Sequence, residues 1–273
     1  MPGTLGIIAG GGPMPARLAA AAQAAGRRVF VLGLDGHVDR AAIAPFPHAV
    51  ARIGAGAEIL GALRGAGVDE VVMIGPVKRP SLLTLMPDAE GARILARIGR
   101  AAFAGDDGLL AAVIRVFEEE GFRVRGAQEV MASLAAPEGV LGAHAPGPAA
   151  EADILRGAAV ARALGAADVG QAVVVQQGIV LGVEAVEGTD ALLVRCGALR
   201  REGPPGVLVK LAKPGQEQRA DLPTIGVRTV EAAAAAGLAG IAVEAGLTLI
   251  PDRAATIAAA DQAGLFLVAR RFG

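Results

Sequence analysis

Short apolar runs alternate with longer helical patterns along the first half of the chain. Residues 5–9, 29–34 and 70–74 are apolar runs of strand length. Between them, 16–25 and 57–66 carry apolar residues at helical spacing. Strands that alternate with helices are typical of a parallel sheet covered by helices. We therefore expect an N-terminal α/β domain with a parallel sheet.

The second half of the chain has a different pattern. A helical pattern at 151–164 precedes two apolar runs, 171–177 and 179–184, which meet at Gly178. Because this half differs in character from the first, we expect a second α/β domain with a mixed sheet. The other predicted elements are helices at 109–120, 191–196, 230–236 and from Asp252 to Ala263, and strands at 122–126, 207–211, 241–243, 248–250 and 265–268.

One stretch shows little periodicity. Residues 132–148 are rich in glycine, proline, alanine and histidine, which is typical of a linker. The 273 residues are enough for two domains of ordinary size. We therefore predict an N-terminal domain at 1–131, a linker at 132–148 and a C-terminal catalytic domain at 149–273.

Composition narrows the classes of function. Hydrophobic residues make up 53% of the chain but aromatic residues only 3%, so the core consists mainly of small and branched aliphatic side chains. The net charge of −1 argues against a nucleic-acid-binding protein, which needs a basic surface with stacking residues. The single cysteine, Cys196, excludes an internal disulfide and favours a buried thiol. The longest apolar stretch, 232–243, is too short to span a bilayer.

The first strand ends in three glycines, Gly10 to Gly12, and the first helix follows. Glycines let a backbone approach a ligand, and a helix N-terminus favours an anion. This start is Rossmann-like, although Pro15 stands where the dinucleotide fingerprint has its third glycine. Asp35 follows the second strand, where a ribose-binding acid would lie. Arg79 lies beyond the third strand and is a candidate for binding an anion, with a plain surface loop as the alternative.

The segment 210–226 is a dense polar loop between two apolar elements, and Pro214 and Pro223 restrict its backbone. Lys213 and Arg219 are suited to hold phosphate oxygens. Asp221 can bind a divalent metal ion or activate a water molecule. This combination is typical of phosphoryl transfer. The alternative is a solvated loop with local ion pairs.

Two acidic motifs provide further candidate ligands. Asp106 and Asp107 precede a helix, and we expect one of them to cap it and the other to be available to Mg²⁺ or a sugar. Thr189 or Asp190 is a candidate cap for the helix at 191–196. Because Glu184 and Glu187 lie close by in the sequence, a metal or sugar site is also plausible there.

Five motifs stand in a fixed order along the chain. They are Ile8-Ala9-Gly10-Gly11-Gly12 with Pro15, Gly105-Asp106-Asp107, Asp168-Val169-Gly170-Gln171, Glu187-Gly188-Thr189-Asp190, and Lys213-Pro214 through Asp221-Leu222-Pro223-Thr224-Ile225-Gly226. In this order they resemble the LpxI family, the UDP-2,3-diacylglucosamine pyrophosphatases of lipid A biosynthesis. The resemblance covers essentially the whole chain. The family often has leucine before the proline of its glycine loop, where this chain has Met14, a nearly volume-neutral change.

The resemblance implies a reaction. UDP-2,3-diacylglucosamine would be hydrolysed to UMP and 2,3-diacylglucosamine 1-phosphate (lipid X) by attack of water on the α-phosphate. It also implies Mg²⁺ (or Mn²⁺), a ligand held between two domains, a homodimer, and an essential aspartate, here Asp221. The expected location is cytoplasmic, with peripheral contact with the inner membrane left open.

Site residues follow from combining the resemblance with the chemistry of the side chains. Asp221 would hold the metal with help from Asp107 or Asp190, and Lys213 and Arg219 would hold the diphosphate. The alternatives are an NAD-linked or nucleotide-sugar oxidoreductase and a non-catalytic carrier of acylated sugars. The remaining candidates for contact with the substrate are the backbone of Gly11 and Gly12, Arg79 near the acyl chains, and the neutral side chains of Gln171, Gln177, Thr189, Gln216 and Thr224.

Overall fold

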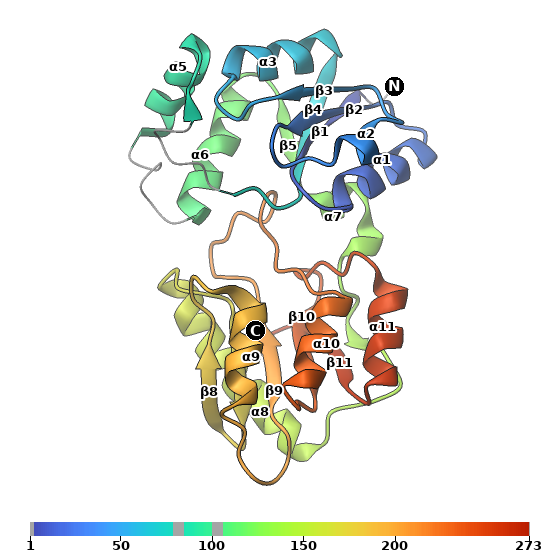
Figure 1. The fold of residues 1–273 in the computed structure, drawn as a ribbon, viewed down its shortest axis with the longest axis vertical. Helices are drawn as coiled ribbons and strands as arrows, with labels where there is room; N and C mark the ends of the chain where they lie inside the picture. The colour runs from blue at the N-terminus through green and yellow to red at the C-terminus, as the bar shows by residue number, and fades with distance from the viewer. Residues whose placement is uncertain (1–2, 79–84, 100–105, 273) are drawn as a thin grey trace. The chain divides into compact units, whose positions relative to one another are not determined.

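The computed structural model describes residues 3–78, 85–99 and 106–272 (Figure 1), without the side chains of Asp106 and Asp107. The chain divides into two compact units. Unit 1 comprises Met1–Ala132 together with Glu217–Asp221. Unit 2 comprises Ser133–Gln216 and Leu222–Gly273. Unit 1 is thus made from two separate pieces of the chain.

Unit 1 contains a five-stranded, fully parallel sheet in the order β3-β2-β1-β4-β5, which confirms the predicted parallel α/β fold. Every residue of β1 is buried, because a parallel sheet with helices on both faces leaves neither face to solvent. The strands are β1 (Thr4–Ala9), β2 (Val29–Leu34), β3 (His48–Ala51), β4 (Val68–Ile74) and β5 (Arg123–Arg125).

Two groups of helices flank this sheet (Figure 1). Helix α3 contacts α5, which contacts α6, and α1 contacts α2 and α7. Leu60 and Leu63 of α3 and Ile114 and Phe117 of α6 form a core with the central strands. The helices are α1 (Met14–Ala24), α2 (Arg40–Ile43), α3 (Gly56–Gly65), α5 (Ala89–Ile98), α6 (Asp106–Glu119) and α7 (Ala127–Val130).

Unit 2 contains a six-stranded sheet in the order β6-β11-β10-β9-β7-β8. Strands β9, β10 and β11 are parallel, whereas β7, β8 and β6 run antiparallel to their neighbours, so the predicted mixed sheet is confirmed. Gln177 and Gly178 join β7 to β8 with φ angles of 54° and 76°, as a two-residue hairpin turn requires. The strands are β6 (Gly139–Val140), β7 (Ala172–Gln176), β8 (Ile179–Val183), β9 (Val207–Lys210), β10 (Gly240–Glu244) and β11 (Phe266–Arg270).

Side chains alternate between the two faces of this sheet. In β7, Val173 and Val175 pack against α8, whereas Ala172 and Val174 face the opposite core with α9 and α10. Both faces are therefore buried. The helices of this unit are α8 (Pro148–Ala166), α9 (Gly188–Gly197), α10 (Val227–Ala235) and α11 (Arg253–Gln262); Asp252 caps α11 by accepting a hydrogen bond from the Ala255 N–H, as predicted.

Two segments differ from the prediction. Within the expected linker, β6 pairs with β11 and the Ala136 N–H donates to the Thr248 carbonyl, so this stretch is built into unit 2. An edge strand of two residues leaves no periodic signal in the sequence. The predicted strand 248–250 is wrong, because Leu249 makes only isolated bridges to Ala135 and Thr224.

Candidate active site

The glycine loop of unit 1 is held by backbone hydrogen bonds. The Gly10 N–H donates to the Ile74 carbonyl and the Gly11 N–H to the Pro76 carbonyl, both at 2.9 Å. A Cβ on Gly10 would lie 2.4 Å from the Gly75 carbonyl oxygen. Glycine is therefore required here by the close approach of two loops. The Gly11 N–H is donated within the protein here, and contact of the Gly11 and Gly12 backbone with a ligand stays a prediction.

Other predicted groups of unit 1 have different outcomes. Arg79 and the Asp107 side chain lie outside the described residues, although the backbone of Asp107 is in the first turn of α6. The Asp35 carboxylate accepts a hydrogen bond from Arg40 at 2.8 Å, which lowers the pKa of Asp35 below its usual value. The predicted ribose-binding acid is thus held by a neighbouring arginine.

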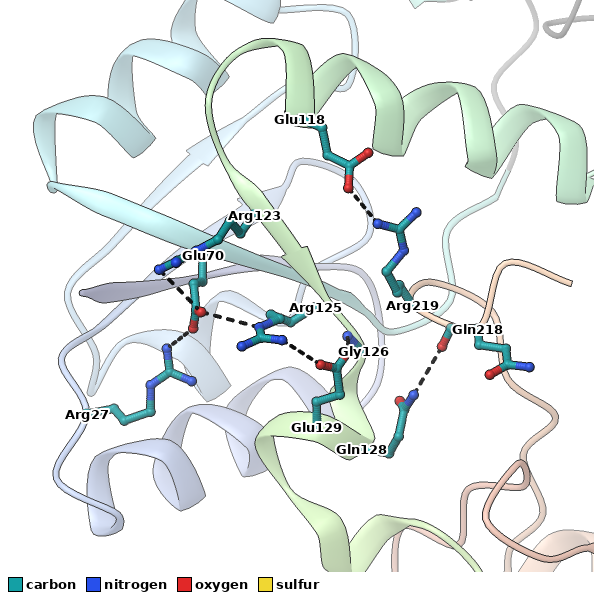
Figure 2. A network of polar contacts seen from close by, with 10 residues as sticks. All are labelled: Arg27, Glu70, Glu118, Arg123, Arg125, Gly126, Gln128, Glu129, Gln218 and Arg219. Carbon is teal, nitrogen blue, oxygen red and sulfur yellow. Dashed lines mark hydrogen bonds and ion pairs between the residues drawn. The ribbon is translucent and has the colours of Figure 1, made fainter. Parts of the chain in front are cut away.

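The Arg219 side chain contacts two carboxylates, those of Glu217 and Glu118; Figure 2 shows the contact with Glu118. Its Nε and Nη2 donate to the two oxygens of Glu217, each at 2.8 Å, and its Nη1 donates to Glu118 Oε1 at 2.6 Å. The hydrogen bonds with Glu217 raise the pKa of Arg219 well above its usual range and lower that of Glu217. In this arrangement the guanidinium fork holds Glu217, and the role of Arg219 as a phosphate ligand stays a prediction.

Asp221 follows directly and is half-buried. The Ala220 and Asp221 N–H groups both donate to the Glu217 carbonyl, at 3.1 and 3.0 Å, which folds the segment into a tight turn. The Ala220 side chain packs against the core of unit 1, and the Gln218 carbonyl accepts from Gln128 at 3.3 Å. Asp221 is thereby carried on unit 1.

In unit 2, a series of hydrogen-bonded polar side chains lies where β9 ends. The Lys210 Nζ donates to the Thr189 hydroxyl at 2.9 Å and to the Thr224 carbonyl at 3.2 Å. The Thr189 hydroxyl in turn donates to Glu184 Oε1 at 2.5 Å, and Glu184 Oε2 accepts the Gln171 N–H at 3.1 Å. Lys210 and Glu184 are only 8% and 7% exposed. Three of the predicted substrate-binding residues, Gln171, Thr189 and Thr224, are thus brought together.

Helix α9 begins without a side-chain cap, so the predicted capping by Thr189 or Asp190 is wrong. Both residues lie inside the helix, which starts at Gly188. The Asp190 carboxylate pairs with Arg228 of α10 at 2.7 Å, and both side chains are exposed. A solvated ion pair is thus its observed role.

Lys213 lies in the turn that follows the end of β9. The Lys213 Nζ pairs with Asp168 Oδ1 at 2.7 Å, and the Lys213 N–H donates to Gln216 Oε1 at 2.9 Å. Gln216 is buried and its own N–H returns to the Lys213 carbonyl. Gln216 therefore shapes the turn, and Lys213 brings a cation to the strand end.

Gln177 lies at the opposite edge of the sheet. Strand β7 runs antiparallel to β9, with Ala172 opposite Lys210 and Val175 opposite Val207. Gln171 therefore lies beside the end of β9 and Gln177 beside its start. The Gln177 amide donates to the Glu202 carbonyl at 2.7 Å and fixes a loop. The predicted contact of Gln177 with substrate is not supported by this position.

Sequence reasoning missed Lys210. It is the last residue of an otherwise apolar strand, and a lysine inside a buried run was the available signal. Gln171 adds a second feature, because its Oε1 is buried and has no hydrogen-bond partner among the described residues. A buried acceptor of this kind is suited to receive a donor from a ligand or a water molecule.

The described residues contain no group of three or more His, Cys, Asp or Glu side chains that could hold a metal ion. The predicted set of Asp221, Asp190 and Asp107 stays a prediction, because the Asp107 side chain lies outside the described residues; Asp190 is paired with Arg228. Mg²⁺ is commonly bound by one or two carboxylates and completed by substrate phosphates and water. A single carboxylate such as that of Asp221 fits that mode of binding.

Two α/β units with charged side chains at strand ends define a two-domain protein suited to polar, anionic ligands. Residues 4–134 match the model of the LpxI N-terminal domain, and residues 137–268 match that of the LpxI C-terminal domain. The chain is 48% identical over 270 residues to the UDP-2,3-diacylglucosamine pyrophosphatase LpxI of Caulobacter vibrioides, covering 97% of this chain and 96% of that protein. The chain belongs to the LpxI family, which confirms the resemblance.

No helix in the described part of the chain has both the length and the apolar character needed to cross a bilayer.

Proposed function

We propose that this protein hydrolyses UDP-2,3-diacylglucosamine to UMP and 2,3-diacylglucosamine 1-phosphate in lipid A biosynthesis. The observation that carries the proposal is the near-full-length match to the Caulobacter vibrioides pyrophosphatase, at 48% identity. Matches to both LpxI domains support it, because they extend over both structural units.

The proposed reaction forms one bond and breaks one. A water oxygen bonds to the α-phosphorus of the uridine half, and the bond from that phosphorus to the bridging oxygen breaks. The bridging oxygen leaves with the acylated sugar phosphate, and the proton of the water passes to the Asp221 carboxylate and from there to solvent. The Asp221 carboxylate is the group we assign to orienting this water, because it is partly exposed and its backbone is fixed by two hydrogen bonds to Glu217.

Unit 2 supplies groups for binding. Lys213 provides positive charge for the diphosphate, and the Asp168 carboxylate keeps its ammonium group in place until phosphate oxygens compete for it. Gln171 Oε1 provides an acceptor for a sugar or uracil donor. Mg²⁺ or Mn²⁺, when bound at Asp221, would neutralise charge on the diphosphate. The homodimer and the contact with the inner membrane stay predictions.

The test is phosphorus NMR on the purified protein with UDP-2,3-diacylglucosamine in ¹⁸O-enriched water, with Mg²⁺ and with excess EDTA. We expect UMP to form only with the metal and to carry the ¹⁸O. Label in the sugar phosphate would contradict attack on the α-phosphate. Binding without turnover would favour the carrier, and a nicotinamide-dependent absorbance change would favour an oxidoreductase.

Two aspartate variants assign the carboxylates. Asp221→Asn keeps the side-chain shape, and we expect turnover to fall by roughly 10²- to 10⁴-fold, the usual contribution of a general base. Asp190→Asn removes only an exposed ion pair, so turnover should stay within about two-fold of wild type. Equal losses in both variants would restore Asp190 as a metal ligand.

A further inference from the structure

The segment Glu217–Asp221 belongs to unit 1, although the residues before and after it belong to unit 2. Three contacts between described residues attach this segment to the rest of unit 1. Ala220 packs on the core, Gln128 donates to the Gln218 carbonyl, and Arg219 pairs with Glu118. The Arg219–Glu118 pair is the one side-chain ion pair among these contacts, and it joins residues 101 positions apart in the sequence.

We propose that Arg219 and Glu118 form a clamp that positions Asp221 on unit 1 for catalysis. Arg219 is then a positioning residue that acts through the backbone of its own segment, and it does not bind phosphate. The inference rests on the proposed function, because it concerns the assigned role of Asp221. It assigns to Arg219 and Glu118 the role of positioning Asp221.

The two halves of the clamp do different work. The bidentate pair between Arg219 and Glu217 is local and stiffens the turn that ends at Asp221. The bond to Glu118 links this stiff turn to helix α6. A displacement of about 1 Å at a catalytic group can lower a rate by roughly 100-fold. Loss of either half therefore affects the reaction more than the fold.

The helix end that carries Glu118 is itself fixed. Glu120, two residues later, accepts hydrogen bonds at 2.5 Å from both Arg97 of α5 and Arg64 of α3. Glu119 also pairs with Arg97. Two neighbouring helices thus hold the end of α6, so Glu118 provides a fixed point of attachment for Arg219.

The kinetic test compares Glu118→Ala, Arg219→Gln and the double variant. We expect each single variant to lower kcat about ten-fold or more while KM stays within about two-fold, since Asp221 is displaced and the binding groups are intact. The double variant should be no slower than the slower single variant, because both remove the same clamp. Arg219→Lys, which keeps a cation for Glu118, should recover part of kcat.

A phosphate-binding Arg219 would give a different pattern. Arg219→Gln would then raise KM, and Glu118→Ala would leave activity unchanged or raise it by releasing the arginine. That result would overturn the clamp. Arg93→Gln is the matched control, because Arg93 pairs with Glu90 on α5 in the same unit, and we expect no change in kcat or KM.

Hydrogen–deuterium exchange tests the clamp without activity. In wild type the Ala220 and Asp221 N–H groups are hydrogen-bonded to Glu217, so their exchange is slowed. Both Glu118→Ala and Arg219→Gln should make it several-fold faster, with no change in Arg93→Gln. Unchanged exchange would overturn the clamp even if wild type proved inactive. Faster exchange in the variants with unchanged kcat would overturn the catalytic role of the clamp. If the wild-type protein were inactive and the variants still exchanged faster, only the pyrophosphatase proposal would be rejected.

Discussion

The loops at the strand ends are held by backbone groups in unit 1 and by charged side chains in unit 2. In unit 1, the loops after β1 and β4 meet through backbone groups, and a Cβ on Gly10 would strike the Gly75 carbonyl. In unit 2, consecutive parallel strands end in Lys210, Glu244 and Arg270, whose long side chains hold neighbouring loops and helices. We therefore expect the strand ends of unit 1 to be sensitive to added side-chain atoms, and those of unit 2 to be sensitive to the loss of a charge.

The largest effect on stability is expected for Lys210→Met. The change leaves the Thr224 carbonyl and the Thr189–Glu184 pair without their buried cation. We expect the free energy of unfolding to fall by about 3 kcal/mol, as for other buried charges that lose a partner. Urea denaturation measures it, with the exposed Lys78→Met as a control that should stay within about 0.5 kcal/mol of wild type. An unchanged free energy of unfolding in Lys210→Met would show that the strand ends of unit 2 do not depend on this charge.

Gly10→Ala should destabilise the protein next most strongly. The three atoms nearest to the new Cβ, at 2.4 to 2.8 Å, are all backbone atoms and cannot rotate away. We expect a loss of about 1–3 kcal/mol, the usual cost of overpacking. Gly61→Ala in α3 is the matched control, and we expect it to stabilise the protein. No atom lies within 4 Å of the added Cβ, and alanine is more favourable than glycine in a helix by about 0.5–1 kcal/mol. Thermal denaturation of both variants would compare the two sites, and stabilisation by both would contradict the close loop contact.

A smaller effect depends on pH. Hydrogen bonds from Arg270 lower the pKa of Glu151 below its usual value. A lowered carboxyl pKa adds stability above the unfolded value of about 4.3, and this contribution disappears as the pH falls through the folded value. Because both side chains are about a third exposed, we expect Glu151→Gln to cost less than about 1 kcal/mol at pH 7. Urea denaturation at decreasing pH should show the two proteins converging; a constant difference would point to lost packing.

The smallest effect concerns the interior of unit 2. The Cys196 side chain is completely buried, and burial raises the pKa of its thiol. The thiolate is the reactive form, so the native protein should not react with a thiol reagent such as DTNB over minutes. The unfolded protein in urea should react with one equivalent. Rapid reaction of the native protein would reveal frequent opening of the core beside α9.

Local patterns predicted the regular elements well. The prediction for β2 matches at both ends, because Val29–Leu34 is a continuous apolar run of strand length. Strand β3 was missed because it has only four residues and begins with a histidine. No bounds were predicted for helix α5, although Asp88 caps it by accepting the Gly91 N–H. The predicted strand around Leu249 failed because apolar composition alone does not provide a neighbouring strand.

The candidate site was predictable only in part. The polar loop and its aspartate could be found from sequence because proline and charge mark them. The partner of Arg219 could not be found, since Glu118 lies 101 positions away and any of many glutamates could have paired with it. The position of Gln177 at the start of β9 could not be predicted either, because strand direction decides which end of a sheet a residue occupies, and strand direction is a long-range property.

The discontinuity of unit 1 also has a consequence for synthesis on the ribosome. The five strands of its sheet lie within the first 125 residues, but residues 217–221 complete the unit only after all of 133–216 has been made. Domains generally fold as the N-terminal chain emerges. A nascent chain can thus assemble the whole parallel sheet and still lack Arg219 and Asp221, so Asp221 reaches unit 1 late in translation.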